Sequence, residues 1–357
     1  MSALSIYAGP TALEIIRRNG LNANQISTLV GASGGPKWFV LYGLDRYLFG
    51  EFFAGRDKPL VTLGSSAGAW RVCCLALADS VAAIERLAML YSSEQYSGQP
   101  STHEVTEKAK IMLAEVLGHK GIQEIINNKV FHTHIIANRC KGFGSSTSRT
   151  LQIIALVASA FANAISRKSL SLFYQRTIFT NMRELSPWAG LIDLDTQLIS
   201  LIEENVFDAM MASGSIPFIL DGVRDIAGAP KGQYWDGGIT DYHFDIPFHS
   251  GSDLVLYPHF SPKVIPGWFD KNLWWRSVDP ANFHNVVLVT PSQSFVDSLP
   301  YGKIPDRKDF NTLDYEVRLA YWQTVLVKSA ELADDFKELI DNDVGLEAIQ
   351  PFDHITK

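Results

Sequence analysis

The sequence predicts an α/β fold with a mostly parallel central sheet. Apolar β-prone runs alternate with helix-forming segments along the chain, which is the pattern of strands joined by crossover helices. Two of the expected strands pass into helices through short Gly/Ser loops. The chain has 357 residues, 46% of them hydrophobic, and can therefore bury a large core. We predict that it forms a single domain. We expect strands at about 26–30, 60–64, 130–138, 176–181, 233–236, 254–258 and 285–290.

The second Gly/Ser loop, GSSAG at 64–68, has the spacing G-x-S-x-G. It follows a short β-prone run and precedes a strongly helix-forming segment at 67–78, so Ser66 lies where a strand passes into a helix. Such a sharp turn lifts the serine hydroxyl clear of the backbone. Gly64 and Gly68 flank it because side chains there would clash. We interpret Ser66 as a nucleophile.

The first Gly/Ser loop, GASGGPK at 31–37, contains the same spacing, with Ser33 as a second candidate nucleophile. Gly34 and Gly35 expose consecutive unhindered N–H groups, and the proline after them suits the first position of a helix. Lys37 adds positive charge beside them. We interpret this loop as an oxyanion hole that serves the other serine, and a nucleophilic Ser33 remains the alternative.

A third segment supplies a carboxylate at a strand end. A short strand at 233–235 runs into Asp236, followed by Gly237 and Gly238, which let other backbone approach closely. Taken alone, Asp-Gly-Gly is most often a turn. Asp236 is therefore a candidate general base only in combination with the two serine loops.

The three motifs in this order resemble the patatin-like phospholipases: Gly-Gly-x-Lys after one strand, Gly-x-Ser-x-Gly after the next, and Asp-Gly-Gly far downstream. The segment ASGSIP at 212–217 is similar to the family's Ala-Ser-x-Ala-x-Pro segment upstream of the acid. The resemblance covers about 26–247. Within a single domain spanning 1–357, we expect residues 248–357 to form a C-terminal extension that packs on this core.

The resemblance implies a three-layer α/β/α patatin-like fold and a Ser–Asp dyad without a catalytic histidine. Ser66 would be the nucleophile and Asp236 the base that takes its proton. The implied oxyanion donors are the N–H groups of Gly34, Gly35 and Ala67, and the implied supporting residues are Lys37, Gly64, Gly68, Gly237 and Gly238. Ser33 and Trp38 stand where the family's loop has its first and last glycines.

The implied activity is hydrolysis of carboxylic ester bonds in phospholipids or lysophospholipids. Attack on an ester carbonyl makes a tetrahedral oxyanion, so N–H donors beside the nucleophile are expected. A carboxylate with an ordinary pKa of about 4 is a poor base at pH 7. Either burial raises the pKa of Asp236 or its positioning compensates, and the sequence leaves both open.

The composition of the chain argues against several classes of partner and cofactor. A net charge of −7 and the lack of basic runs argue against a nucleic-acid partner. The three cysteines give no disulfide framework, and the first residues lack the apolar stretch of a signal peptide, so we expect a cytoplasmic protein. His132 and His134 share one side of a strand without a nearby third ligand, and we predict neither a metal nor another cofactor.

Two apolar stretches suggest peripheral contact with a membrane. Residues 151–165 are strongly apolar but too short to span a bilayer, which takes about 20 residues, so either a core or cap helix or a lipid-contacting helix fits. Four aromatic residues fall within 266–276, a composition that suits a membrane interface or a lipid-tail channel. Packing of the C-terminal part is the alternative. The oligomeric state is not predicted.

Two other classes of function stay open. His243, His259 and His284 follow Asp236, so the order Ser…Asp…His of an α/β-hydrolase esterase is available. An inactive binding or storage protein with the same fold is the third class, suggested by the altered loop around Ser33.

Overall fold

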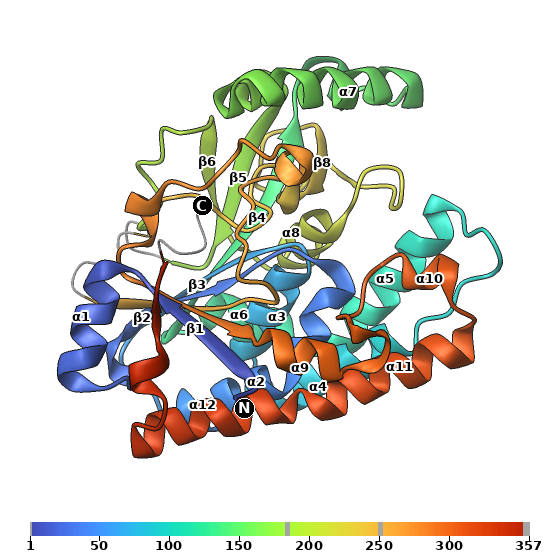
Figure 1. Cartoon of the computed structure of the whole chain (residues 1–357). Coiled ribbons are helices and arrows are strands. Elements are labelled where there is room, and N and C mark those ends of the chain that lie inside the picture. The colour runs from blue at the N-terminus through green and yellow to red at the C-terminus, as the bar shows by residue number, and fades with distance from the viewer. Residues whose placement is uncertain (1, 183–185, 249–252, 353–357) are drawn as a thin grey trace.

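The computed structural model describes residues 2–182, 186–248 and 253–352. They form one sheet of eleven strands in the order β11-β1-β10-β9-β2-β3-β4-β5-β6, with β8 paired to β4 and β7 to β8. Helices cover the sheet in a three-layer α/β/α arrangement (Figure 1). The strands are β1 (Leu4–Ala8), β2 (Ile26–Gly31), β3 (Leu60–Ser65), β4 (Phe131–Cys140), β5 (Tyr174–Thr180), β6 (Thr196–Ser200), β7 (Val223–Arg224), β8 (Gln233–Asp236), β9 (Leu254–Pro258), β10 (Val286–Pro291) and β11 (Gln350–Pro351).

The seven expected strands are all present, and the sheet is mostly parallel as predicted. The central run β10-β9-β2-β3-β4 is parallel throughout. The antiparallel pairs are β1 with β10, β4 with β5, β4 with β8, and β7 with β8. The sequence prediction missed β1, β6, β7 and β11, which are short or lie toward the sheet edges and so lack the apolar runs of doubly covered strands.

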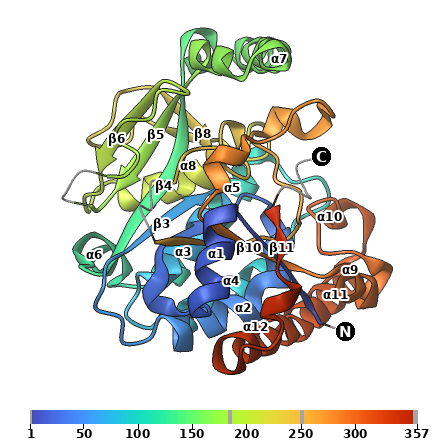
Figure 2. The same cartoon turned by 60° about the vertical axis from the view of Figure 1, so that its left-hand side comes forward.

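The helices are α1 (Pro10–Asn19), α2 (Tyr42–Tyr47), α3 (Ala67–Leu75), α4 (Ser80–Ser92), α5 (Thr102–Leu117), α6 (Gly121–Asn127), α7 (Arg149–Ile165), α8 (Val206–Gly214), α9 (Gln293–Ser298), α10 (Asp309–Thr312), α11 (Tyr315–Lys328) and α12 (Ala330–Asn342). Helix α3 packs on β2, β3 and β4, and α8 packs on β4 and β8. Figures 1 and 2 show α7 at one end of the molecule, far from α11 and α12.

The part of the chain after residue 247 belongs to the same sheet. Strands β9 and β10 lie between β2 and β1, with Leu256 opposite both Leu29 and Val287. Helices α11 and α12 pack against α2. The C-terminal third therefore both completes the sheet and covers the core. None of the helices in the described ranges is long and apolar enough to cross a membrane.

Candidate active site

Sheet register brings the two distant motifs together. Strands β3 and β4 are parallel with Ser65 opposite Ile136, and β8 lies antiparallel to β4 with Asp236 opposite Ala137. Adjacent residues of β4 thus fix the end of β3 and the end of β8 beside each other. The loops at these strand ends meet at one edge of the sheet, the usual place of a ligand site in α/β proteins.

Ser66 occupies a strained turn between β3 and α3. Its φ of 55° and ψ of −131° fall in a region that residues other than glycine rarely adopt. The Ser66 hydroxyl donates a hydrogen bond of 2.7 Å to Oδ2 of Asp236, and both side chains are buried. The sequence analysis placed these two residues in one site, and the structure brings them into direct contact.

The flanking glycines allow the turn because backbone atoms approach very closely there. A Cβ on Gly64 would lie 2.4 Å from Cα of Ala69, and one on Gly68 would lie 2.0 Å from the carbonyl oxygen of Gly31. Neither contact can be relieved by moving a flexible side chain. The first turn of α3 is therefore held against β2 and β3 at a spacing that only glycine permits.

The segment 212–217 ties the serine and the carboxylate to one another. The Ser66 N–H donates to Oγ of Ser213 at 2.9 Å, and the Asp236 N–H donates to the carbonyl oxygen of Ser215 at 2.8 Å. The sequence analysis noted this segment only as a resemblance. Its physical role is to fix the backbones of both residues from the end of α8.

Hydrogen bonds and close backbone packing hold the Asp236 loop in place. The Gly238 N–H donates to Oδ1 of Asp236 at 2.7 Å, which leaves Oδ2 for Ser66. The Asn138 side-chain amide donates to the carbonyl oxygens of Asp236 and Gly237 at 2.9 and 3.1 Å. A Cβ on Gly237 would lie 2.3 Å from the Ile136 carbonyl oxygen, so the loop needs glycine there.

Burial raises the pKa of Asp236 to about 6, although the hydrogen bonds from Ser66 and Gly238 act in the opposite direction. The more distant charges of Arg307 and Lys271 also lower it. Of the two explanations that the sequence left open, burial therefore contributes. A carboxylate with this pKa is still ionised at pH 7 and is a stronger base than an ordinary aspartate.

The Gly34-Gly35 loop lies against Ser66, as the sequence analysis expected. Gly35 has a φ of +56°, and Gly34, Gly35 and Ser66 line a common cavity. Within the described ranges, the N–H groups of Gly34, Gly35 and Ala67 have no protein acceptor. Lys37 lines the same cavity and pairs with Asp306 at 3.5 Å.

The other candidate serine is placed differently. Ser33 is buried, and its hydroxyl shares a 2.9 Å hydrogen bond with that of Ser65. Its N–H donates to the carbonyl oxygen of Tyr242 at 2.9 Å. Ser33 thus joins the two Gly/Ser loops, whereas Ser66 holds the hydrogen bond to the carboxylate.

The three histidines considered for a triad make no hydrogen bond to Ser66 or Asp236 in the described structure. His243 is buried and accepts the Ile265 N–H on Nδ1, and burial lowers its pKa. His259 is also buried, with Nδ1 bonded to the backbone of Ser261. His284 is exposed and contacts the carbonyl oxygen of Ala281 at 2.9 Å.

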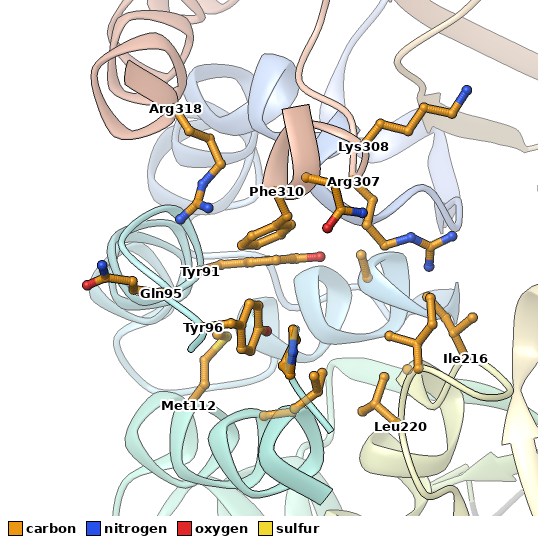
Figure 3. A pocket seen from close by; sticks show the side chains of 18 of the residues that line it. Tyr91, Gln95, Tyr96, Met112, Ile216, Leu220, Arg307, Lys308, Phe310 and Arg318 are labelled. Carbon is orange, nitrogen blue, oxygen red and sulfur yellow. The ribbon is translucent and has the colours of Figure 1, made fainter. Parts of the chain in front are cut away.

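Two cavities meet at Ser66. The larger has a volume of about 570 Å³ and lies between α5, the 214–220 segment and residues 307–318. Its lining is mainly apolar and aromatic: Trp70, Tyr96, Val105, Met112, Ile216, Phe218, Leu220, Phe310 and Leu313. Figure 3 shows Tyr96, Met112 and Leu220 on one wall and Phe310 on the other. The smaller cavity, about 80 Å³, also contains Asp236 and Gly238.

Sequence reasoning missed several residues of the site. Arg307 lines both cavities, and Lys271 lines the smaller one. Tyr91 is half-buried, and its hydroxyl lies next to Gly35, where an added Cβ would lie 3.4 Å away from it. No local motif marks these residues. The aromatic stretch around Lys271 was the only signal in the sequence.

A serine in a strained strand-to-helix turn, hydrogen-bonded to a buried carboxylate and flanked by N–H groups without an acceptor, is an arrangement that can support acyl transfer in an α/β protein. The model of the family described as Patatin-like phospholipase matches residues 32–248. The chain belongs to this family of hydrolases. The motif resemblance and the three-layer fold are thereby confirmed.

Comparison with solved structures finds the crystal structure of VipD from Legionella pneumophila, at 14% sequence identity and a TM-score of 0.33. The match covers 72% of this chain and 53% of VipD, so the chain spans about half of that protein's length. It is too distant to bear on the activity of this chain. Comparison with curated proteins gives no match.

Proposed function

We propose that the protein is a lipid acyl hydrolase that cleaves carboxylic ester bonds of phospholipids or lysophospholipids through a Ser66–Asp236 dyad. The observation that carries the proposal is the 2.7 Å hydrogen bond from the strained Ser66, which lines a mainly apolar cavity, to Asp236. Membership of the patatin-like phospholipase family supports the same chemistry.

In the proposed mechanism, Oγ of Ser66 attacks the ester carbonyl carbon while its proton passes to Oδ2 of Asp236. The carbonyl oxygen becomes an oxyanion and accepts hydrogen bonds from the N–H groups of Gly34, Gly35 and Ala67. The tetrahedral intermediate then collapses, the C–O bond of the alcohol breaks, and Asp236 returns the proton to the leaving oxygen. Water, deprotonated by Asp236, releases the fatty acid from Ser66 in a second cycle of the same steps.

The larger cavity suits the acyl chain of the substrate. Its volume of about 570 Å³ lies within the roughly 300–1,000 Å³ of ordinary ligand pockets, and its lining is mainly apolar. The sequence analysis offered the aromatic residues of 266–276 as a tail channel, but Trp274 and Trp275 do not line the cavity. They are exposed, by 87% and 53%.

Helix α7 supports the proposal of peripheral membrane contact. It packs on the protein through Ala155, Ser159 and Asn163, and it exposes large apolar side chains instead of burying them. These exposed residues are Ile153, Ile154, Val157, Phe161 and Ile165. Helix α7 also packs on the 3-10 helix Trp268–Asn272, and Arg276 donates to the Asn163 carbonyl oxygen, so the exposed tryptophans adjoin this helix. Exposed apolar and Trp side chains in adjoining segments are typical of surfaces that enter a lipid interface.

We expect faster turnover of long-chain phospholipid or lysophospholipid in vesicles or micelles than of short soluble esters, without Ca²⁺.

Replacing Trp274 and Trp275 by Ala should weaken vesicle binding, measured by co-sedimentation, more than it slows hydrolysis of a short p-nitrophenyl ester, because the two rings lie outside the larger cavity. The matched control is the double variant Val327→Ala with Val344→Ala. Both valines are exposed; Val327 lies in α11 and Val344 follows α12. Figure 1 shows these two helices at the end of the molecule opposite α7.

Equal losses on both substrates would make the tryptophans structural. A clear preference for short soluble esters would contradict the lipid assignment itself. Absence of any acyl turnover in purified protein would favour the alternative of an inactive binding protein.

The pH profile should report the raised pKa of Asp236. Because the carboxylate must be ionised to accept the Ser66 proton, kcat/KM for a neutral soluble ester should fall about tenfold per pH unit below pH 6. An aspartate with its ordinary pKa of 3.8 would keep the profile flat almost to pH 4. Circular dichroism at each pH checks that the protein stays folded, and a flat profile between pH 6 and 4.5 in folded protein would contradict this prediction.

A further inference from the structure

The smaller cavity beside Ser66 gathers positive charge that the proposed hydrolysis does not use. Lys37, Lys271 and Arg307 line it together with the carboxylates Asp236 and Asp306. Asp236 is held by Ser66 and by the Gly238 N–H, and Asp306 pairs with Lys37 at 3.5 Å. The cavity therefore carries more cations than carboxylates.

Lys271 and Arg307 have no ion-pair partner within the described ranges. The ammonium group of Lys271 lies 3.8 Å from the centre of the Tyr242 ring and 5.9 Å from that of Trp268. Although the residue as a whole is exposed, desolvation and the charges of Lys37 and Arg307 lower its pKa to about 8. Like charges that line one cavity repel one another, and a bound anion offsets that repulsion.

The position of these three cations determines which part of the substrate they contact. Ser66 lines both cavities, and the larger, apolar one suits the acyl chain. The carbonyl carbon must lie at Ser66, so the smaller cavity is left for the alcohol side of the ester. In a phospholipid, that side carries a phosphate.

We propose that Lys37, Lys271 and Arg307 form a subsite for the phosphate group of a phospholipid whose ester carbonyl lies at Ser66. This inference rests on the proposed function and adds selection against uncharged glycerides. Lys37 comes from the oxyanion loop, whereas Lys271 and Arg307 come from the C-terminal third, which thereby takes part in recognition. Arg307 supplies planar paired donors for phosphate oxygens, and Lys271 supplies a compact charge.

The first test compares kcat/KM for a phospholipid with that for a diacylglycerol of the same acyl chains in mixed micelles. The phospholipid-to-diacylglycerol ratio should be well above one in the wild type. It should fall about tenfold to hundredfold in Lys271→Met and in Arg307→Met, the loss expected for one charge-assisted hydrogen bond. Lys263→Met, which removes an exposed cation outside both cavities, should leave the ratio unchanged.

The pH profile separates recognition from structure. Above pH 8, where Lys271 loses its proton, the phospholipid rate should fall while the diacylglycerol rate does not. The other ionisable groups at the cavity are Lys37, Arg307, Asp236, Asp306 and Tyr242. Lys271→Arg should restore the ratio and remove this fall, because guanidinium keeps its charge.

A binding measurement tests the inference without depending on turnover. Calorimetry on the Ser66→Ala variant should show that glycerol 3-phosphate binds, that glycerol does not, and that Arg307→Met abolishes the binding. If calorimetry showed binding of inorganic phosphate while kcat/KM showed no preference for phospholipid over diacylglycerol, the cavity would be a site for free phosphate. That result would overturn the proposal. Equal losses on both lipids in the variants would also overturn it while leaving the hydrolase function intact, whereas absence of turnover on both would count against the hydrolase alone.

Discussion

Ser66→Ala should abolish ester hydrolysis, with a loss on the order of 10⁴-fold or more, as expected when a serine hydrolase loses its nucleophile. The same variant should no longer react covalently with a fluorophosphonate. The physical reason is that Ser66 is the hydroxyl in contact with the carboxylate, at 2.7 Å, and its backbone conformation aims it at both cavities. Intact-mass spectrometry after labelling and steady-state rates on a p-nitrophenyl ester measure the two effects.

Ser33→Ala is the matched control, because Ser33 lies at the centre of the same G-x-S-x-G spacing. It should leave labelling intact and reduce turnover, since it removes only the hydrogen bond to Ser65 that joins the two loops. Peptide mapping of the adduct to Ser33 would reverse the assignment of the nucleophile.

Asp236→Asn should lower turnover by about 10²–10⁴-fold, the usual contribution of general acid–base catalysis. The fold should be retained, because the asparagine carbonyl can still accept the Gly238 N–H that Oδ1 now accepts. The amide nitrogen would face Ser66 as a donor and could not take its proton. Thermal denaturation beside the rate measurement separates lost chemistry from lost structure.

A histidine scan provides the control for this prediction. His243→Asn and His259→Asn keep an acceptor near Nδ1, and His284→Gln changes an exposed residue. Each variant should retain most of the activity. If one of them lost as much activity as Ser66→Ala while staying folded, the dyad would have to be replaced by a Ser-His-Asp triad.

The sequence by itself determined the parts of the site that depend on local backbone chemistry. A sharp strand-to-helix turn needs glycine wherever another backbone crosses within van der Waals distance, so Gly64 and Gly68 left a readable pattern around Ser66. Gly237 did the same for the loop that carries Asp236. The covered strands were also predictable, because their apolar runs are continuous. In β1, buried and half-buried residues alternate, and β7 has only two residues, so neither left such a pattern.

Only the tertiary structure decided what surrounds these motifs. The register of β3, β4 and β8 places Asp236 against Ser66 across 170 residues of chain, although two serines had the same local spacing. Burial, which sets the pKa of Asp236, is a property of everything packed around the carboxylate. The larger cavity and the positions of Lys271 and Arg307 likewise depend on the C-terminal third folding back onto the sheet, an arrangement fixed by long-range packing that no local pattern records.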